Sequence, residues 1–241
     1  MAALEIIGIH KKFGGVVALA GVDITIETAR ITGVIGPNGS GKTTLFNVVA
    51  GAFPPTAGRV VWQGEDITGK RSYDIARRGV VRTYQQSMSY PALSVRDNVR
   101  IGCEHGRAPN LRTAARWQSA DEILDFVGLG GLGDVTAGAL SFGNLRRLGL
   151  AVALGAEPLL LLLDEPAAGL SDSEGAALTE LILSFPQLGL GVCVIDHDMA
   201  LMGAICEHLV VLNFGTKIAE GTPQDVLNDA TVLDVYLGTG T

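Results

Sequence analysis

Apolar positions occur in short blocks along the first third of the chain, and the period of each block predicts its element. Short apolar or alternating runs predict strands over residues 4–9, 22–26, 31–35 and 58–62. Helices are predicted over residues 42–50 and 72–78, and the Gly14-Gly15 pair is typical of a turn. The third strand leads through a glycine-rich segment directly into the first helix, which predicts a strand, loop and helix in that order.

The pattern changes at about residue 87. Residues 87–140 contain no convincing strand, and apolar spacing over residues 120–127 is helical, which predicts a helical insertion. Beyond it the chain predicts helices over residues 144–154 and 174–183 and strands over residues 159–163, 191–195, 209–212 and 216–219, followed by a helix that starts at Pro223. Continuous apolar strands that alternate with helices indicate an α/β fold with a parallel sheet buried on both faces.

Composition supports a globular chain with a sizeable core. Hydrophobic residues make up 47% of the 241 positions and charged residues 18%. The 32 glycines come with only 9 prolines and no repeated period, which excludes a collagen-like chain. The longest apolar stretches, residues 148–156 and 159–163, are too short to span a membrane, and the N-terminus does not resemble a secretory signal.

Charge is divided unevenly along the chain. The net charge of −7 argues against a dedicated nucleic-acid binder. Residues 1–147 carry 17 basic and 12 acidic side chains, whereas residues 148–241 carry 1 and 13. We therefore expect anionic groups to be bound by the first part and cations by the second. Cys103, Cys193 and Cys206 are odd in number and have no CxxC spacing, which is typical of reduced thiols in a cytosolic protein.

The strongest chemical motif follows the strand at residues 31–35 and satisfies the phosphate-loop pattern GxxxxGK[ST]. Its residues are Gly36, Pro37, Asn38, Gly39, Ser40, Gly41, Lys42, Thr43 and Thr44. Glycines let backbone N–H groups converge on phosphates, Lys42 supplies a charge to the β- and γ-phosphates, and the Thr43 hydroxyl is a ligand for Mg²⁺. A chance match would occur in roughly one shuffled sequence in a hundred, and the placement between strand and helix lowers that further.

A second motif, Asp164-Glu165-Pro166, follows the strand at residues 159–163. The carboxyl ends of parallel strands collect ligands, so we expect Asp164 to hold Mg²⁺ and Glu165 to orient or deprotonate an attacking water. The alternative, a solvated acidic turn, is less favoured beside a phosphate loop. Ser141 precedes the helix predicted at residue 144, where it serves as an N-cap or as part of an anion site.

These motifs occur in the order phosphate loop, Leu140-Ser141-Phe142-Gly143, Asp164-Glu165-Pro166 and Ile195-Asp196-His197-Asp198. Over essentially the whole chain this resembles the nucleotide-binding subunit of an ATP-binding-cassette (ABC) transporter. The resemblance implies a P-loop NTPase fold of the ABC ATPase type: a mostly parallel core sheet, an N-terminal antiparallel β subdomain and a helical insertion. It implies one domain over residues 1–241, with its core at 1–86 and 156–241 and a helical signature subdomain at about 87–155.

The resemblance also implies residue roles and an ATPase activity, ATP plus water giving ADP and phosphate. Gln85 resembles the glutamine that senses Mg²⁺ and the attacking water, with Gln86 as its rival. His197 resembles the histidine that contacts the γ-phosphate; its alternative is a buried structural histidine. Phe13 resembles the aromatic that stacks on adenine; its alternative is an ordinary apolar contact.

Ser141 and Gly143 imply a partner, because in this family the signature segment of one subunit caps the γ-phosphate bound by another. Two chains would then close head to tail around two ATP molecules. The chain departs from the common pattern at Phe142, Asn144 and Ser171. Since the catalytic positions are intact, we expect reduced or partner-dependent hydrolysis at most, and no loss of ATP binding.

Several longer strings, among them residues 13–19, 79–85, 164–170, 220–225 and 235–238, resemble ATPases of bacterial branched-chain amino-acid importers. The expected partners are a second ABC ATPase, integral membrane permeases and, indirectly, a substrate-binding protein, on the cytoplasmic face of the inner membrane. Urea or amide importers and lipid or lipopolysaccharide exporters are alternatives. A DNA-associated ATPase is less favoured, because it would need long coiled-coil heptads before the signature segment. A translation factor would need a second cassette in the same chain. A cassette that only binds ATP for regulation would not need Glu165 and His197.

The arginines around the insertion lead to a hypothesis about docking. They stand at positions 77, 78, 82, 96, 100, 107, 112 and 116. The resemblance places the insertion nearest the membrane partner, so we expect a basic surface that faces acidic coupling loops or anionic lipid headgroups.

Overall fold

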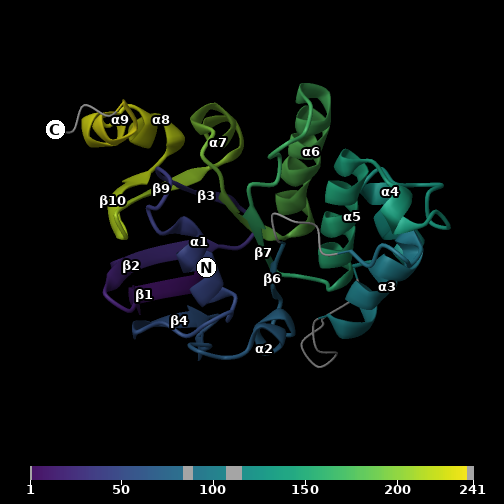
Figure 1. The fold of residues 1–241 in the computed structure, drawn as a ribbon, viewed down its shortest axis with the longest axis horizontal. Coiled ribbons are helices and arrows are strands. Elements are labelled where there is room, and N and C mark those ends of the chain that lie inside the picture. The colour runs from purple at the N-terminus through teal and green to yellow at the C-terminus, as the bar shows by residue number, and fades with distance from the viewer. Residues whose placement is uncertain (1, 84–88, 107–115, 238–241) are drawn as a thin grey trace. The chain divides into compact units, whose positions relative to one another are not determined.

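Long-range contacts divide the chain into two units, one formed by Met1–Ser72 with Phe185–Thr241 and the other by Tyr73–Ser184. The computed structural model in Figure 1 describes residues 2–83, 89–106 and 116–237. The second unit is larger than the predicted helical subdomain of about 87–155, because it also contains a pair of strands and two further helices. The subdomain boundaries stay a prediction.

The first unit contains an antiparallel sheet of four strands in the order β2-β1-β4-β5. Its strands are β1 (Ala2–Phe13), β2 (Val16–Glu27), β4 (Ala57–Trp62) and β5 (Glu65–Asp66). Alternate residues of β2, namely Val22, Ile24 and Ile26, are buried, as the alternating pattern predicts. Both β1 and β2 are longer than predicted, because backbone pairing continues to Phe13 opposite Val16, beyond the apolar residues.

The same unit contains a second set of strands in the order β10-β9-β3-β8. They are β3 (Ile31–Ile35), β8 (Gly191–Ile195), β9 (His208–Asn213) and β10 (Thr216–Gly221). β3 pairs in parallel with both β8 and β9, and every residue of β3 and β8 is buried. The continuous apolar runs therefore mark parallel strands, as predicted.

Helices of the first unit are α1 (Lys42–Val49), α7 (Met199–Ile205), α8 (Pro223–Leu227) and α9 (Ala230–Leu237). α1 and α8 agree with the prediction, and Pro223 stands in the first turn of α8. α7 and α9 were not predicted. Asp198 caps α7 by accepting from the N–H groups of Ala200 and Leu201, and this cap lies inside a segment that the sequence marks as a motif.

The second unit combines a parallel strand pair with helices: β6 (Val80–Arg82) pairs with β7 (Leu160–Asp164). Its helices are α2 (Ser72–Ala76), which begins at the boundary, α3 (Val95–His105), α4 (Ala120–Phe126), α5 (Phe142–Gly155) and α6 (Asp172–Ser184). α3, α4 and α5 pack against one another (Figure 1), which confirms the predicted helical character over the described residues. A Cβ at Gly102 of α3 would lie 2.2 Å from the Val152 carbonyl oxygen of α5, so glycine permits this close helix contact.

No helix within the described ranges is long and apolar enough to cross a membrane. The described residues contain no disulfide, and Cys193 and Cys206 are buried. Burial raises the pKa of Cys206 to about 12, so this thiol is protonated and unreactive near neutral pH.

Candidate active site

The phosphate loop lies in the first unit, between the end of β3 and the start of α1. Its backbone adopts conformations that only glycine accepts without strain: φ is 80° at Gly39 and 105° at Gly41. A Cβ at Gly41 would also lie 2.7 Å from the Ala18 carbonyl oxygen. Because Gly41 is the N-cap of α1 and brings no side-chain cap, the first N–H groups of α1 are available to a phosphate.

Lys42 is buried and turned back over the loop. Its Nζ donates to the carbonyl oxygens of Gly36 at 2.6 Å and Pro37 at 3.0 Å. The hydroxyl of Ser40 is buried and has no hydrogen-bond partner among the described residues. A buried ammonium, an unsatisfied hydroxyl and a glycine cradle fit the phosphates of a nucleotide. Thr43, in the first turn of α1, is exposed, which suits its predicted role as a ligand for a cation.

Two further predicted residues belong to the same unit. His197 follows β8 just as the phosphate loop follows β3, and these strands are parallel neighbours with Val34 opposite Ile195. The His197 side chain is 64% exposed, so the alternative of a buried structural histidine is wrong. Its Nδ1 lies 3.6 Å from Asp196 Oδ1, and Asp196 also accepts from the His197 backbone N–H at 2.7 Å.

Phe13 ends β1 and is 46% exposed. Its ring meets that of Phe53 edge to face with the centroids 5.2 Å apart. The Lys11 Nζ lies 5.0 Å from the Phe13 centroid and 4.5 Å from that of Phe53. An exposed ring braced by a second aromatic is suited to stacking on a planar base.

A cavity of about 400 Å³ lies beside the phosphate loop. Pro37, Asn38 and Ser40 of the loop line it together with Thr231, Asp234 and Val235 of α9. Tyr236 belongs to the same helix and its hydroxyl is buried, which raises the pKa of Tyr236 to about 12. α9 is therefore part of the surroundings of the phosphate loop, which the sequence alone does not reveal.

In the second unit, Asp164 and Glu165 occupy the carboxyl end of β7. Asp164 is buried, and its Oδ2 accepts from Arg82 Nη2 at 2.8 Å. Glu165 has a φ of 45°, a left-handed conformation that is unusual for glutamate. The two adjacent carboxylates thus differ: Asp164 is buried and paired with an arginine, and Glu165 is half-buried.

The signature segment begins α5. Ser141 is exposed and is the N-cap: its Oγ accepts from the Asn144 N–H at 3.3 Å. Gly143 is buried, and a Cβ there would lie 2.3 Å from Glu174 Oε1, so no other residue fits without displacing Glu174. The Phe142 ring is 52% exposed and close to Gly169, whose Cβ would lie 3.2 Å from it.

Arg146 connects the signature helix with the loop after Glu165. Its Nη2 donates to the Ala168 carbonyl oxygen at 3.2 Å, and its guanidinium lies 5.0 Å from the Phe142 centroid. Burial lowers the pKa of Arg146, and the Glu165 carboxylate opposes that shift. Arg146 was not predicted as a site residue, since nothing in the local sequence shows which groups the second turn of a helix meets.

The departure at Ser171 has a structural role. Its N–H and Oγ donate to Glu174 Oε2 at 3.1 and 2.8 Å, which closes the start of α6 and lowers the pKa of Glu174. Glu174 in turn faces Gly143. The departures at Phe142 and Ser171 therefore belong to one contact region, formed by the signature segment and the loop between β7 and α6.

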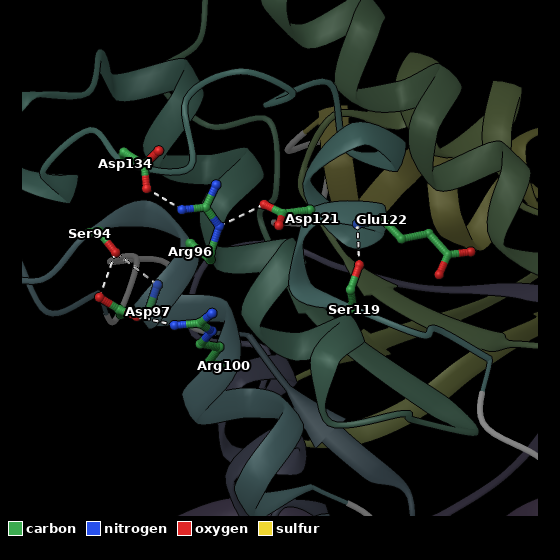
Figure 2. A network of polar contacts seen from close by, with 8 residues as sticks. All are labelled: Ser94, Arg96, Asp97, Arg100, Ser119, Asp121, Glu122 and Asp134. Atoms are coloured by element: carbon green, nitrogen blue, oxygen red, sulfur yellow. Dashed lines mark hydrogen bonds and ion pairs between the residues drawn. The ribbon is translucent and has the colours of Figure 1, made fainter.

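Gln85 and its rival Gln86 lie outside the described residues. Of the arginines in the docking hypothesis, Arg82 has a side chain that is only 5% exposed and is paired with Asp164, so its assignment to a basic surface is wrong. Figure 2 shows that Arg96 bonds Asp121 and Asp134 and that Arg100 bonds Asp97, so these charges are partly neutralised at the surface. Arg107 and Arg112 lie outside the described residues.

Comparisons with known proteins show the family of the chain. The sequence model of the ABC transporter family matches residues 19–168, and a model named branched-chain amino acid ATP-binding cassette transporter matches residues 216–241. The chain belongs to the ABC transporter ATP-binding family, whose members are ATPases.

Individual relatives cover nearly all of the chain. It is 36% identical to the high-affinity branched-chain amino acid transport ATP-binding protein BraF of Pseudomonas aeruginosa, over 98% of this chain and 97% of BraF. It is 35% identical to a probable branched-chain amino acid transport ATP-binding protein LivG of Archaeoglobus fulgidus, over 99% and 96%. It is 33% identical to the lipopolysaccharide export system ATP-binding protein LptB of Haemophilus influenzae, over 99% and 98%.

A solved structure is similar to this chain in fold as well as in sequence. The ADP conformation of MJ1267, an ATP-binding cassette of an ABC transporter, superposes with a TM-score of 0.87 at 32% identity, over 99% of each chain. The predicted α/β fold of the ABC ATPase type is therefore confirmed.

Proposed function

We propose that the chain is the ATP-hydrolysing subunit of an ABC importer for branched-chain or other hydrophobic amino acids. The main support is a phosphate loop closed by Lys42, in a chain whose relatives BraF and LivG are named for branched-chain amino acid transport. The substrate class is inferred from the names of these relatives.

In this proposal the first unit holds the nucleotide. Lys42 exchanges its bonds to the Gly36 and Pro37 carbonyls for the β- and γ-phosphates, and the first N–H groups of α1 bind the same anions. Phe13 stacks on the adenine, and His197 contacts the γ-phosphate. Phe13 and His197 are exposed, whereas Lys42 must give up its bonds to the two carbonyls to reach the phosphates.

The second unit supplies the carboxylates. Mg²⁺ held by Thr43, Asp164 and Gln85 would neutralise charge on the β- and γ-phosphates. Glu165 orients the attacking water and accepts its proton as the oxygen attacks phosphorus, while the bond to the leaving ADP oxygen breaks. The attraction between the Glu165 carboxylate and the Arg146 guanidinium supports its place in this cluster.

Partners follow from the signature segment. Ser141 and Phe142 are exposed at the N-terminus of α5, which suits binding to a γ-phosphate held by another subunit. We propose a head-to-tail dimer, with itself or with a paralogue, attached to integral membrane permeases at the cytoplasmic face of the inner membrane. A substrate-binding protein would deliver the amino acid to the permeases.

The second candidate is lipopolysaccharide or lipid export, which the similarity to LptB favours. Uptake of radiolabelled leucine by vesicles that contain the chain and its co-encoded permeases distinguishes the two. ATP-dependent leucine accumulation that disappears with Glu165→Gln supports import. Vigorous ATP hydrolysis without leucine or urea accumulation, together with lipid extraction by the same complex, would contradict it.

A further inference from the structure

Arg82 and Asp164 form a buried ion pair at the ends of two adjacent strands. β6 and β7 run in parallel with Arg82 opposite Leu162, so the guanidinium reaches two residues along β7 to the carboxylate. Nη2 donates to Oδ2 at 2.8 Å, and the two side chains are only 5% and 10% exposed. The carboxylate proposed to hold Mg²⁺ is thus bound to a permanently charged residue of the same unit.

The second carboxylate oxygen is differently placed. Asp164 Oδ1 has no hydrogen-bond partner among the residues that the structure describes, so an anionic oxygen is present for a cation. This donor fits Mg²⁺, which is commonly bound through one carboxylate together with substrate phosphates and water. The carboxylate therefore offers one oxygen to a metal while Arg82 holds the other.

Two cations on one buried carboxylate repel each other strongly, because solvent screens them little. Binding of a divalent ion therefore weakens the bond between Arg82 and Asp164. Both residues line a cavity of about 280 Å³, so the guanidinium has space for another rotamer. In the absence of metal, the same guanidinium keeps Asp164 in a single orientation.

We propose that Arg82 is a positioning residue that competes with the divalent cation for Asp164. Arg82 holds the Asp164 carboxylate in place while the site is empty. Its bond to the carboxylate weakens when Mg²⁺ and ATP bind, and forms again as Mg²⁺ and ADP leave. This inference rests on the proposed role of Asp164 in ATP hydrolysis. Its consequence is that Arg82 weakens Mg²⁺ binding and so favours release of the product.

The test measures metal affinity apart from turnover. In the Glu165→Gln background, which keeps ATP intact, a fluorescent ATP analogue is titrated in EDTA and then at increasing Mg²⁺. Arg82→Gln retains a hydrogen-bond donor without the charge. We expect the Mg²⁺ concentration that produces half of the Mg²⁺-dependent change in analogue binding (the half-maximal Mg²⁺ concentration) to fall about fivefold in this variant. In EDTA its affinity for the analogue should fall, since the negative charge of Asp164 is then no longer offset by Arg82.

Arg82→Lys keeps the charge, so its half-maximal Mg²⁺ concentration should stay within twofold of the parent. Arg96→Gln is the matched control, because it removes an arginine paired with Asp121 and Asp134 at the surface of the same unit. If Arg82→Gln fails to fold, Arg82→Lys and Mn²⁺ binding by electron paramagnetic resonance provide the measurement, with Mn²⁺ affinity again expected within twofold of the parent.

An unchanged or raised half-maximal Mg²⁺ concentration in Arg82→Gln overturns the inference. An affinity for the analogue that is weakened equally with and without Mg²⁺ also overturns it, because that is the result expected if the ion pair only supports the fold. So does a change in Mn²⁺ affinity beyond twofold in Arg82→Lys. Failure of the parent itself to bind the analogue contradicts the proposed function instead.

Discussion

The phosphate loop of the first unit and the carboxylate cluster of the second are built on different principles. In the phosphate loop, backbone groups and one lysine make the site, and Lys42 bonds carbonyls only five and six residues away. In the cluster, side chains far apart in sequence make it: Arg82 reaches Asp164 across 82 positions, and Arg146 reaches Ala168 across 22. A local motif therefore identifies the first site, whereas strand pairing and helix packing assemble the second.

The largest expected effect is on the second unit. Glu165→Gln removes the proposed proton acceptor, and we expect the hydrolysis rate to fall by about 10² to 10⁴. ATP binding should persist, and size-exclusion chromatography with ATP should show a trapped dimer. The matched control is Glu180→Gln, a glutamate within α6. Hydrolysis by Glu165→Gln at the parental rate would rule out the proposed base.

The corresponding change in the first unit is Lys42→Ala. Because a buried ammonium and its phosphate bonds are lost, ATP affinity should fall about 100-fold in isothermal titration calorimetry. Lys70→Ala, which removes a partly exposed lysine near Glu65, should bind ATP as the parent does. Tight binding by Lys42→Ala would show that the loop does not depend on its charge, and the contrast between the two sites would lose its basis.

Arg146→Met tests whether the cluster acts in hydrolysis rather than in binding. It removes the bond to the Ala168 carbonyl and the charge near Glu165, so kcat should fall about tenfold while ATP affinity stays within twofold. Arg146→Lys should recover most of kcat. Equal losses in kcat and in thermal stability for both variants would indicate a packing role only.

The smallest effect concerns the adenine. Phe13→Ala removes one stacking ring, worth about 1 kcal/mol, so ATP affinity should fall about fivefold, and Phe13→Tyr should restore it. Binding of tripolyphosphate should be equal in all three proteins, because that ligand has no base. A weakened affinity for tripolyphosphate in Phe13→Ala would mean that the ring supports the phosphate loop instead.

Sequence reasoning placed the buried parallel strands well and placed poorly the elements that depend on pairing or packing with distant parts of the chain. The buried strands β3 and β8 end where their apolar runs end, because burial on both faces requires a continuous apolar stretch. β6 has only three residues, and its strand character depends on pairing with β7. α9 was missed as well, although its residues line the cavity beside the phosphate loop.

The sequence by itself determined the phosphate loop, the acidic pair after the leucine strand and the family, because each depends on residues adjacent along the chain. It also indicated Ser141 as a cap, since a cap bonds a group three residues away. Only the tertiary structure decided that Arg82 belongs to Asp164 rather than to a basic surface, and that Arg146 links Phe142 with the loop after Glu165. Such partners are set by which strands pair and how helices pack, and no local pattern encodes them.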